Sequence, residues 1–335
     1  MVRYLEQSEK QKIRPLYQAC FDDTEEYCNY YFEKRLPQNE VAVCERDTSF
    51  AGMIHLIPKT VGIGHEFITQ CHYLYAVATA LEFRKQGVMG QILRRVLGDL
   101  HDAGELFTYL IPSSEENAQI YRKYGFARVM DKRILKDTDI RMNRLPGIRS
   151  YRAKREDIPA LSAYAQCKMA ENYAIYISKN IHYFEKMLEL MEIEDGEITI
   201  FEKEGSILGY RIGSEDEVLE EVLEPEISAL AWESSESKPY TMARVLNIPK
   251  MLECVSTTVS GHIYIEVMDS VIEENNGVFL WEYDAGGCRW TKVENQKAEI
   301  QISVEDFTAH LMGYKRIERL PEMDVKQGFY MNDYV

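Results

Sequence analysis

The sequence predicts an α/β protein of three domains, and three observations lead to this expectation. The chain has 335 residues, which is too long for one ordinary core. Strand-like and helix-like patterns alternate over the first 135 residues, which indicates a mixed sheet with helices packed on it. Two polar stretches, 137–150 and 233–238, are predicted to be linkers. We therefore expect domains at residues 1–140, 150–232 and 239–335.

The first domain is expected to begin with two helices, at 8–21 and around the aromatic cluster 27–32. Strands, a long amphipathic helix from residue 88 and a short helix around Tyr121 follow. The expected strands are 40–47, 51–63, 72–79, 106–112 and 126–135.

Behind this domain, residues 151–221 are expected to form two helices and a β-hairpin that turns at Glu204-Gly205. The last domain begins with a strand-to-helix pattern at 242–255, and continues with three strands and a helix that starts at Ser303. Asp306 lies three residues after Ser303, as in a capping box.

Composition narrows the function classes. The chain is 45% hydrophobic and 28% charged, typical of a soluble globular protein, and no apolar run approaches the ~20 residues of a membrane span. The seven cysteines are scattered and odd in number, which predicts reduced thiols in a cytoplasmic protein and no metal site. The net charge of −16 argues against nucleic acid and favours a cationic partner.

The most informative stretch is 76–97, where a strand ends near Thr79 and a helix opens after a short charged turn. The first turn of a helix has unpaired N–H groups at the positive end of its dipole, which is a natural phosphate cradle. Gly87 allows a close backbone approach, and Arg84 and Lys85 add positive charge. The stretch therefore predicts a diphosphate-binding turn. An ordinary glycine turn between a strand and a helix is the alternative.

A second signal follows about 30 residues later. A strand leads into Asn117-Ala118, and then come Tyr121, Tyr124 and Gly125-Phe126. A phenol with a pKa near 10 is able to donate a proton at neutral pH without being ionised beforehand. Tyr121 is the candidate proton donor of this segment and Tyr124 its competitor. The alternative is that both tyrosines only pack the helix on the sheet.

These two motifs, in this order, resemble the GCN5-related N-acetyltransferases (the GNAT superfamily). The resemblance implies acetyl-CoA as co-substrate and direct transfer of acetyl to an amine. It also implies that Tyr121 is the acid and that a strand N–H, at Val77 or Thr79, binds the thioester oxygen. The cofactor-binding residues implied are Val77, Thr79, Arg84, Lys85, Gln86, Gly87, Val88, Gly90 and Asn117. Met89 occupies a position where the superfamily usually has Gly or Ala.

The later segments are similar to the Eis (enhanced intracellular survival) branch of that superfamily. Residues 239–335 resemble its C-terminal sterol-carrier-like domain, whereas 150–232 is shorter than its usual second acetyltransferase-like lobe. This resemblance implies that the α-carboxylate of Val335 is the catalytic base, with a frayed terminus as the alternative. It also implies a cationic acceptor, aminoglycoside-like or polyamine-like, or a lysine, and a homo-oligomer.

Smaller signals have competing interpretations. Tyr27, Tyr30 and Tyr31 are candidates for an acceptor pocket, although such clusters are more often core. The acidic run Glu220, Glu221, Glu224 and Glu226 is expected to be a solvated face. The competing function for the whole chain is a lipid- or sterol-binding protein with a vestigial acetyltransferase domain.

Overall fold

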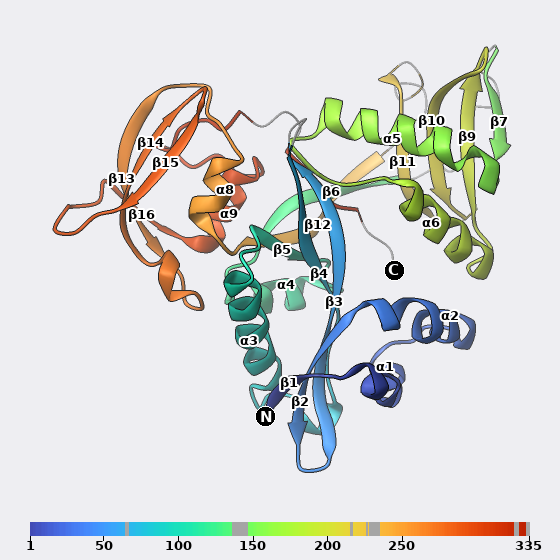
Figure 1. Cartoon of the computed structure of the whole chain (residues 1–335), viewed down its shortest axis with the longest axis horizontal. Coiled ribbons are helices and arrows are strands. Elements are labelled where there is room, and N and C mark those ends of the chain that lie inside the picture. The colour runs from blue at the N-terminus through green and yellow to red at the C-terminus, as the bar shows by residue number, and fades with distance from the viewer. Residues whose placement is uncertain are drawn as a thin grey trace.

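The computed structural model describes residues 1–63, 67–135, 147–214, 217–225, 227, 235–324 and 328–332. Three sheets, each with its own helices, form three lobes, and the blue-to-green N-terminal lobe lies between the other two along the chain's long axis (Figure 1). The expected mixed α/β class is confirmed. The expected linker 137–150 lies mostly outside the described residues.

The N-terminal sheet has the strand order β1-β2-β3-β4-β5-β12-β6, and β8 pairs with β3 and with β17. Its strands are β1 (Val2–Tyr4), β2 (Glu40–Arg46), β3 (Ser49–Ile63), β4 (Phe67–Thr79), β5 (Phe107–Leu110), β6 (Ala127–Leu135), β8 (Ile175–Ile177), β12 (Ser235–Val245) and β17 (Phe329–Tyr330).

Strand β12 was not expected in this sheet. It pairs with β5 through 242–245 and with β6 through 235–243, so the expected third domain, 239–335, shares its first strand with the N-terminal sheet. The prediction of a linker at 233–238 was wrong from Ser235 onward. This part of β12 pairs with β6 on one side only and 236–239 is exposed, so polar residues are tolerated in it.

Helices cover both faces of the N-terminal sheet. One face carries the 3-10 helix η1 (Gln7–Ile13), α1 (Arg14–Cys20), α2 (Glu25–Tyr30), the π-helical turn η2 (Tyr31–Arg35) and the 3-10 turn η3 (Leu36–Gln38). The other face carries the 3-10 turn η4 (Leu81–Phe83), α3 (Val88–Asp102) and α4 (Glu115–Arg122). Alternate residues of β2 divide between the two cores: Val41 and Val43 face α1, and Ala42 and Cys44 face α3.

The middle lobe is a four-stranded antiparallel sheet, in the order β11-β10-β9-β7, with two helices packed against it. The predicted hairpin is confirmed: β9 and β10 pair, and Glu204 and Gly205 both have positive φ at the turn. Its elements are β7 (Arg149–Arg152), η6 (Arg155–Asp157), α5 (Ile158–Asn172), α6 (Ile181–Ile193), β9 (Glu197–Lys203), β10 (Ser206–Gly213) and β11 (Val218–Leu223).

The C-terminal lobe has the strand order β15-β14-β13-β16, and Trp281 and Phe307 fill its core. The predicted cap of its helix is confirmed, because the Ser303 hydroxyl accepts from the Asp306 N–H at 3.1 Å. Its elements are α8 (Ile248–Glu253), β13 (Gly261–Met268), η7 (Glu273–Asn275), β14 (Gly277–Asp284), β15 (Gly287–Lys292), β16 (Ile300–Ser303) and α9 (Val304–Leu311). No helix in the described part of the chain is long and apolar enough to cross a bilayer.

Candidate active site

The site begins at a break in the N-terminal sheet. Strand β4 pairs in parallel with β5 at Tyr73, opposite Tyr109, whereas its pairing with β3 continues to Thr79. A β-bulge interrupts the β3–β4 ladder between the pairs Met53–Ala78 and His55–Tyr75, and Ala76 within it has φ 48°. Bulges bend a strand and locally change the direction of its groups. Among the described strands, residues 74–79 therefore have no ladder partner on the β5 side, and we call this divergence of β4 from β5 the opening.

Two backbone N–H groups of β4 are directed toward this opening. The Ala80 N–H donates to the Ala51 carbonyl of β3 at 3.0 Å. Successive N–H groups of a strand point to opposite edges, so the N–H groups of Val77 and Thr79 point away from β3. The Thr79 carbonyl, on the same edge, accepts from Arg84 Nε at 3.1 Å. Both sequence-predicted strand residues thus lie at the opening.

The charged turn leads into an uncapped helix. Gly87 is the N-cap residue of α3 with φ 76° and ψ 10°, and it provides no side-chain cap. The first helical bond runs from the Gln91 N–H to the Gly87 carbonyl at 3.1 Å. The N–H groups of Val88, Met89 and Gly90 consequently have no acceptor within the helix.

The side chains of the turn are exposed, but their contacts differ. Arg84, Lys85 and Gln86 lie at the surface, and Gln86 Nε2 donates to the Glu82 carbonyl at 2.8 Å. Val88 is buried in the core beneath the sheet, so its side chain packs and its N–H remains for an anion. Asn117 donates its amide to Ser113 Oγ at 2.8 Å and lies at the start of α4.

Gly90 has a packing role that the sequence did not indicate. A Cβ at this position would approach the Tyr124 hydroxyl, and the Arg94 guanidinium lies over the Tyr124 ring at 5.2 Å. The missing side chain therefore lets α3 approach Tyr124 closely. Tyr124 is therefore held against α3, which indicates a packing role for Tyr124.

Tyr121 is buried, with 7% of its surface exposed, and its ring packs edge-on to Phe126 at 6.0 Å. It belongs to the same core as Val88 of α3 and Leu110 at the end of β5. Its hydroxyl makes no hydrogen bond with another residue in the described part of the chain. Burial raises the pKa of Tyr121 to about 12, which keeps the phenol protonated at neutral pH.

The aromatic cluster of α1 and α2 lies on the other face of the sheet, beside the bulge. The Tyr75 hydroxyl is 2.7 Å from that of Tyr17 and 3.2 Å from that of Tyr27, and Tyr17 donates to Asp23 at 2.6 Å. Tyr31 is fully buried, and its hydroxyl lies 2.7 Å from His55 Nδ1.

Of the three tyrosines expected in an acceptor pocket, Tyr30 is half-buried, whereas Tyr27 and Tyr31 are buried. Tyr75, which precedes the bulge and is also half-buried, is a site residue that the sequence reasoning missed. Tyr75 directly precedes Ala76 in the β-bulge, and the sequence gives no sign of that bulge.

The C-terminal segment 328–332 is packed into the centre of the molecule. Phe329 and Met331 are buried, and Phe329 packs against Phe107 of β5 at 5.6 Å. The Met331 carbonyl accepts from the Thr241 hydroxyl at 2.9 Å. Phe107, Phe329 and Met331 belong to the same core as the tyrosine cluster, so this segment lies on the α1 face of the sheet. Val335 itself lies outside the described residues.

A buried ion pair supports the same segment. Lys179 and Glu220 have no exposed side-chain surface and lie 2.6 Å apart, and Lys179 also donates to the Asn332 carbonyl at 3.4 Å. Tyr210 donates to Glu220 at 2.6 Å. The expectation of a solvated acidic face was therefore wrong at Glu220, because Lys179 and Tyr210 provide partners for its carboxylate inside the protein. It was also wrong at Glu221, whose side chain is 2% exposed and pairs with Arg211. Glu226 lies outside the described residues.

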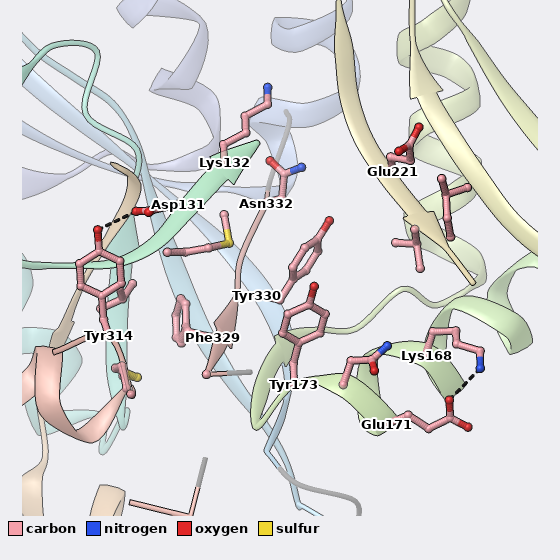
Figure 2. A pocket seen from close by; sticks show the side chains of 18 of the residues that line it. Asp131, Lys132, Lys168, Glu171, Tyr173, Glu221, Tyr314, Phe329, Tyr330 and Asn332 are labelled. Atoms are coloured by element: carbon pink, nitrogen blue, oxygen red, sulfur yellow. Dashed lines mark hydrogen bonds and ion pairs between the residues drawn. The ribbon is translucent and has the colours of Figure 1, made fainter. Parts of the chain in front are cut away.

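A cavity of about 640 Å³ opens beside the tail, between β6, α5 and β11. Figure 2 shows the rings of Tyr173 and Tyr330 side by side in it, and their centroids are 4.6 Å apart. Ion pairs lie along its wall, such as the one within α5 between Lys168 and Glu171 at 2.8 Å. No group of three or more His, Cys, Asp or Glu side chains suited to a metal ion occurs among the described residues.

Two domain families match parts of the chain. Residues 1–129 match the acetyltransferase (GNAT) domain family, and residues 248–325 match the sterol carrier protein domain family. The protein is therefore an acyltransferase with a GNAT acetyltransferase domain at its N-terminus and a sterol carrier protein domain near its C-terminus. No curated protein matches this sequence.

Solved structures share the fold over nearly the whole chain. A conserved protein from Enterococcus faecalis V583, described as a probable N-acyltransferase, is 19% identical with a TM-score of 0.74, over 94% of this chain and 90% of that one. A GCN5-related N-acetyltransferase from Anabaena variabilis is 16% identical with a TM-score of 0.74, over 93% and 90%. Eis1 from Mycobacterium abscessus is 12% identical with a TM-score of 0.69, over 93% and 90%.

Proposed function

We propose that the protein is an acetyl-CoA-dependent N-acetyltransferase of the cytoplasm that acts on a primary amine. The observation that carries the proposal is the opening beside the β4 bulge. The uncapped first turn of α3 follows β4 after η4 and the charged turn, and Tyr121 packs in the same core as that turn. A phosphate cradle and a buried neutral acid thus lie on one side of the opening.

Coenzyme A is bound in this proposal with its diphosphate at the N–H groups of Val88 and Gly90. Arg84 and Lys85 supply positive charge at the rim, and Gln86 and Asn117 are polar contacts beside it. The pantetheine arm enters the opening between β4 and β5. The N–H of Val77 or Thr79 then donates to the thioester oxygen, where negative charge develops during attack.

The acceptor nitrogen attacks the thioester carbon, and the carbon–sulfur bond breaks as the amide forms. The departing thiolate, whose conjugate acid has a pKa of about 8.5 by analogy with cysteine, takes a proton from Tyr121. As the amide forms, the nitrogen releases one proton, which replaces the proton that Tyr121 gave to the thiolate. A second proton must leave the nitrogen before attack, because an ammonium with a pKa near 10 has no lone pair.

We assign that second proton to the α-carboxylate of Val335. Three residues after Asn332 span at most about 10 Å, and Asn332 is buried with its carbonyl held by Lys179, which fixes the point from which they extend. A carboxylate near pKa 3.5 is a weak base in water, and burial would raise its pKa. The same negative charge attracts an ammonium group.

The acceptor class follows from charge and aromatic surface. A net charge of −16 favours a cationic molecule, and the half-buried rings of Tyr30 and Tyr75 suit an ammonium group. An aminoglycoside-like or polyamine-like amine, or a lysine side chain, has this chemistry.

The test is a short C-terminal extension. Adding four glycines after Val335 moves the carboxylate, so the turnover number for acetyl transfer should fall at least about 100-fold, the usual contribution of a positioned base. Calorimetry should give an unchanged dissociation constant for coenzyme A. The matched control is the same extension before Met1, which is 84% exposed. An unchanged turnover number in the protein with the C-terminal extension would show that the α-carboxylate of Val335 is not the catalytic base.

A further inference from the structure

A second, smaller cavity of about 240 Å³ lies between the N-terminal domain and the middle lobe. Its wall is formed by η2 and η3 on one side and by η6 and α6 on the other. The lining residues are Lys34, Arg35, Gln38, Arg155, His182, Glu185, Lys186 and Glu189. Four of these side chains are cationic and two are anionic, in a chain whose net charge is −16.

Arg35 is the unusual member of this group. Only 6% of its surface is exposed, and it forms no ion pair with any residue that the structure describes. Its Nη1 is buried without a well-formed hydrogen bond, and the neutral hydroxyl of Tyr30 beside it is enclosed in the same way. A neutral hydroxyl does not cancel the charge of a buried guanidinium, and native proteins normally provide an anion for one.

Two carboxylates face the cations of this cavity. Glu185 lies 3.8 Å from His182 on the same helix, and Glu189 is close enough to Tyr30 for its charge to raise the pKa of that phenol. Burial lowers the pKa of His182, and the positive charges of Lys186 and Arg35 lower it further. The cavity therefore has a positive potential even with both glutamates counted.

We propose that this cavity is an anion site that binds one phosphate group, free or as a monoester. A guanidinium presents two parallel N–H donors that match phosphate oxygens, and Lys34 and Arg155 line the same cavity with further positive charge. The volume suits a single phosphate with its water, and is too small for a nucleotide. A bound phosphate connects η2 of the N-terminal domain to α6 of the middle lobe.

This site is separate from the proposed diphosphate cradle. Residues 31–35 belong to the α1 face of the N-terminal sheet, whereas Val88 and the first turn of α3 belong to the opposite face. The inference does not depend on the proposed acetyl transfer, because it needs no turnover.

The experiment measures thermal unfolding of the full chain with inorganic phosphate or with sodium chloride at the same ionic strength. A ligand that binds the folded state raises the unfolding temperature with its concentration. Phosphate should raise it for the natural protein and chloride should not. Arg35→Met should unfold at a higher temperature than the natural protein when phosphate is absent, because a buried unpaired charge is gone. Its affinity for phosphate should be about 10- to 100-fold lower.

Arg84→Met is the matched control, because it removes an arginine from the other phosphate-binding candidate. The phosphate response should persist in Arg84→Met and disappear in Arg35→Met. The opposite pattern would place phosphate at α3 and overturn the proposal, as would an equal response to chloride. A less stable Arg35→Met protein would show that Arg35 already has its stabilising partner within the chain.

Discussion

Replacing Tyr121 with phenylalanine tests the general acid most directly. The substitution keeps the buried ring and its edge-on contact with Phe126, and removes a hydroxyl that has no hydrogen-bond partner among the described residues. The free energy of unfolding should therefore change by less than about 1 kcal/mol. A loss of activity in Tyr121→Phe would then report on chemistry and not on folding.

The magnitude follows from the two acids involved. With a pKa of about 12, Tyr121 is roughly 3.5 units weaker than a thiol at about 8.5, so complete ionisation of the phenol in favour of the thiolate is uphill by about 5 kcal/mol. The proton is therefore donated only as the carbon–sulfur bond breaks, and the phenolate must be reprotonated in the same turnover. A positioned acid contributes about 10²- to 10⁴-fold, or about 3–5 kcal/mol of transition-state stabilisation.

The assay is thiol release from acetyl-CoA with a panel of amines. Tyr121→Phe should lower kcat by about 10²- to 10⁴-fold and leave the KM for acetyl-CoA nearly unchanged, because the interaction is made in the transition state. The natural enzyme should show no alkaline decline from Tyr121 below about pH 11, since its pKa is raised to about 12.

Tyr124→Phe is the control, because Tyr124 lies on the next turn but packs against Gly90. A Tyr121→Phe enzyme within a few-fold of the natural rate would refute the assignment. A larger loss of kcat in Tyr124→Phe than in Tyr121→Phe would show that Tyr124 is the general acid.

Two further outcomes concern stability. Arg244 and Asp269 form a fully buried ion pair at 2.6 Å, so Asp269→Asn should destabilise the protein by about 3–5 kcal/mol in urea unfolding. The asparagine keeps an oxygen for the N–H groups of Val271 and Ile272, so the double change Arg244→Met with Asp269→Asn should recover part of this loss. A double variant no more stable than Asp269→Asn would contradict the pairing argument. Burial lowers the pKa of His55 to about 3. Between pH 6.5 and 3 the unfolded chain therefore binds a proton that the folded chain does not. The free energy of unfolding should decrease by up to about 1.4 kcal/mol for each unit by which the pH is lowered in this range. His55→Asn should remove that part of the slope, and an unchanged slope would show that His55 titrates normally.

Local signals were sufficient for the elements that carry the cofactor motif. The apolar spacing after Gly87 predicted α3, and the Ser303 cap and the Glu204-Gly205 turn were also found where expected. Each of these depends on residues close together in the chain, where periodicity and turn chemistry are visible.

The features that were missed depend on partners distant in sequence. Glu220 looked solvated because Lys179, which neutralises it, lies 41 residues away. Strand β12 looked like the start of a separate domain because its pairing with β5 spans more than 130 residues. The bulge at Ala76 leaves no signature in alternating apolar residues, so Tyr75 was not recognised as a site residue.

The position of β12 also has a consequence for synthesis of the protein. The ribosome produces β5 and β6 long before residues 235–245 emerge, and until then the facing edges of both strands lack a neighbour. Unpaired strand edges promote association between chains. A fragment that ends at residue 140 would retain those edges permanently, so a truncated acetyltransferase domain should be prone to aggregation even though its motifs are all present.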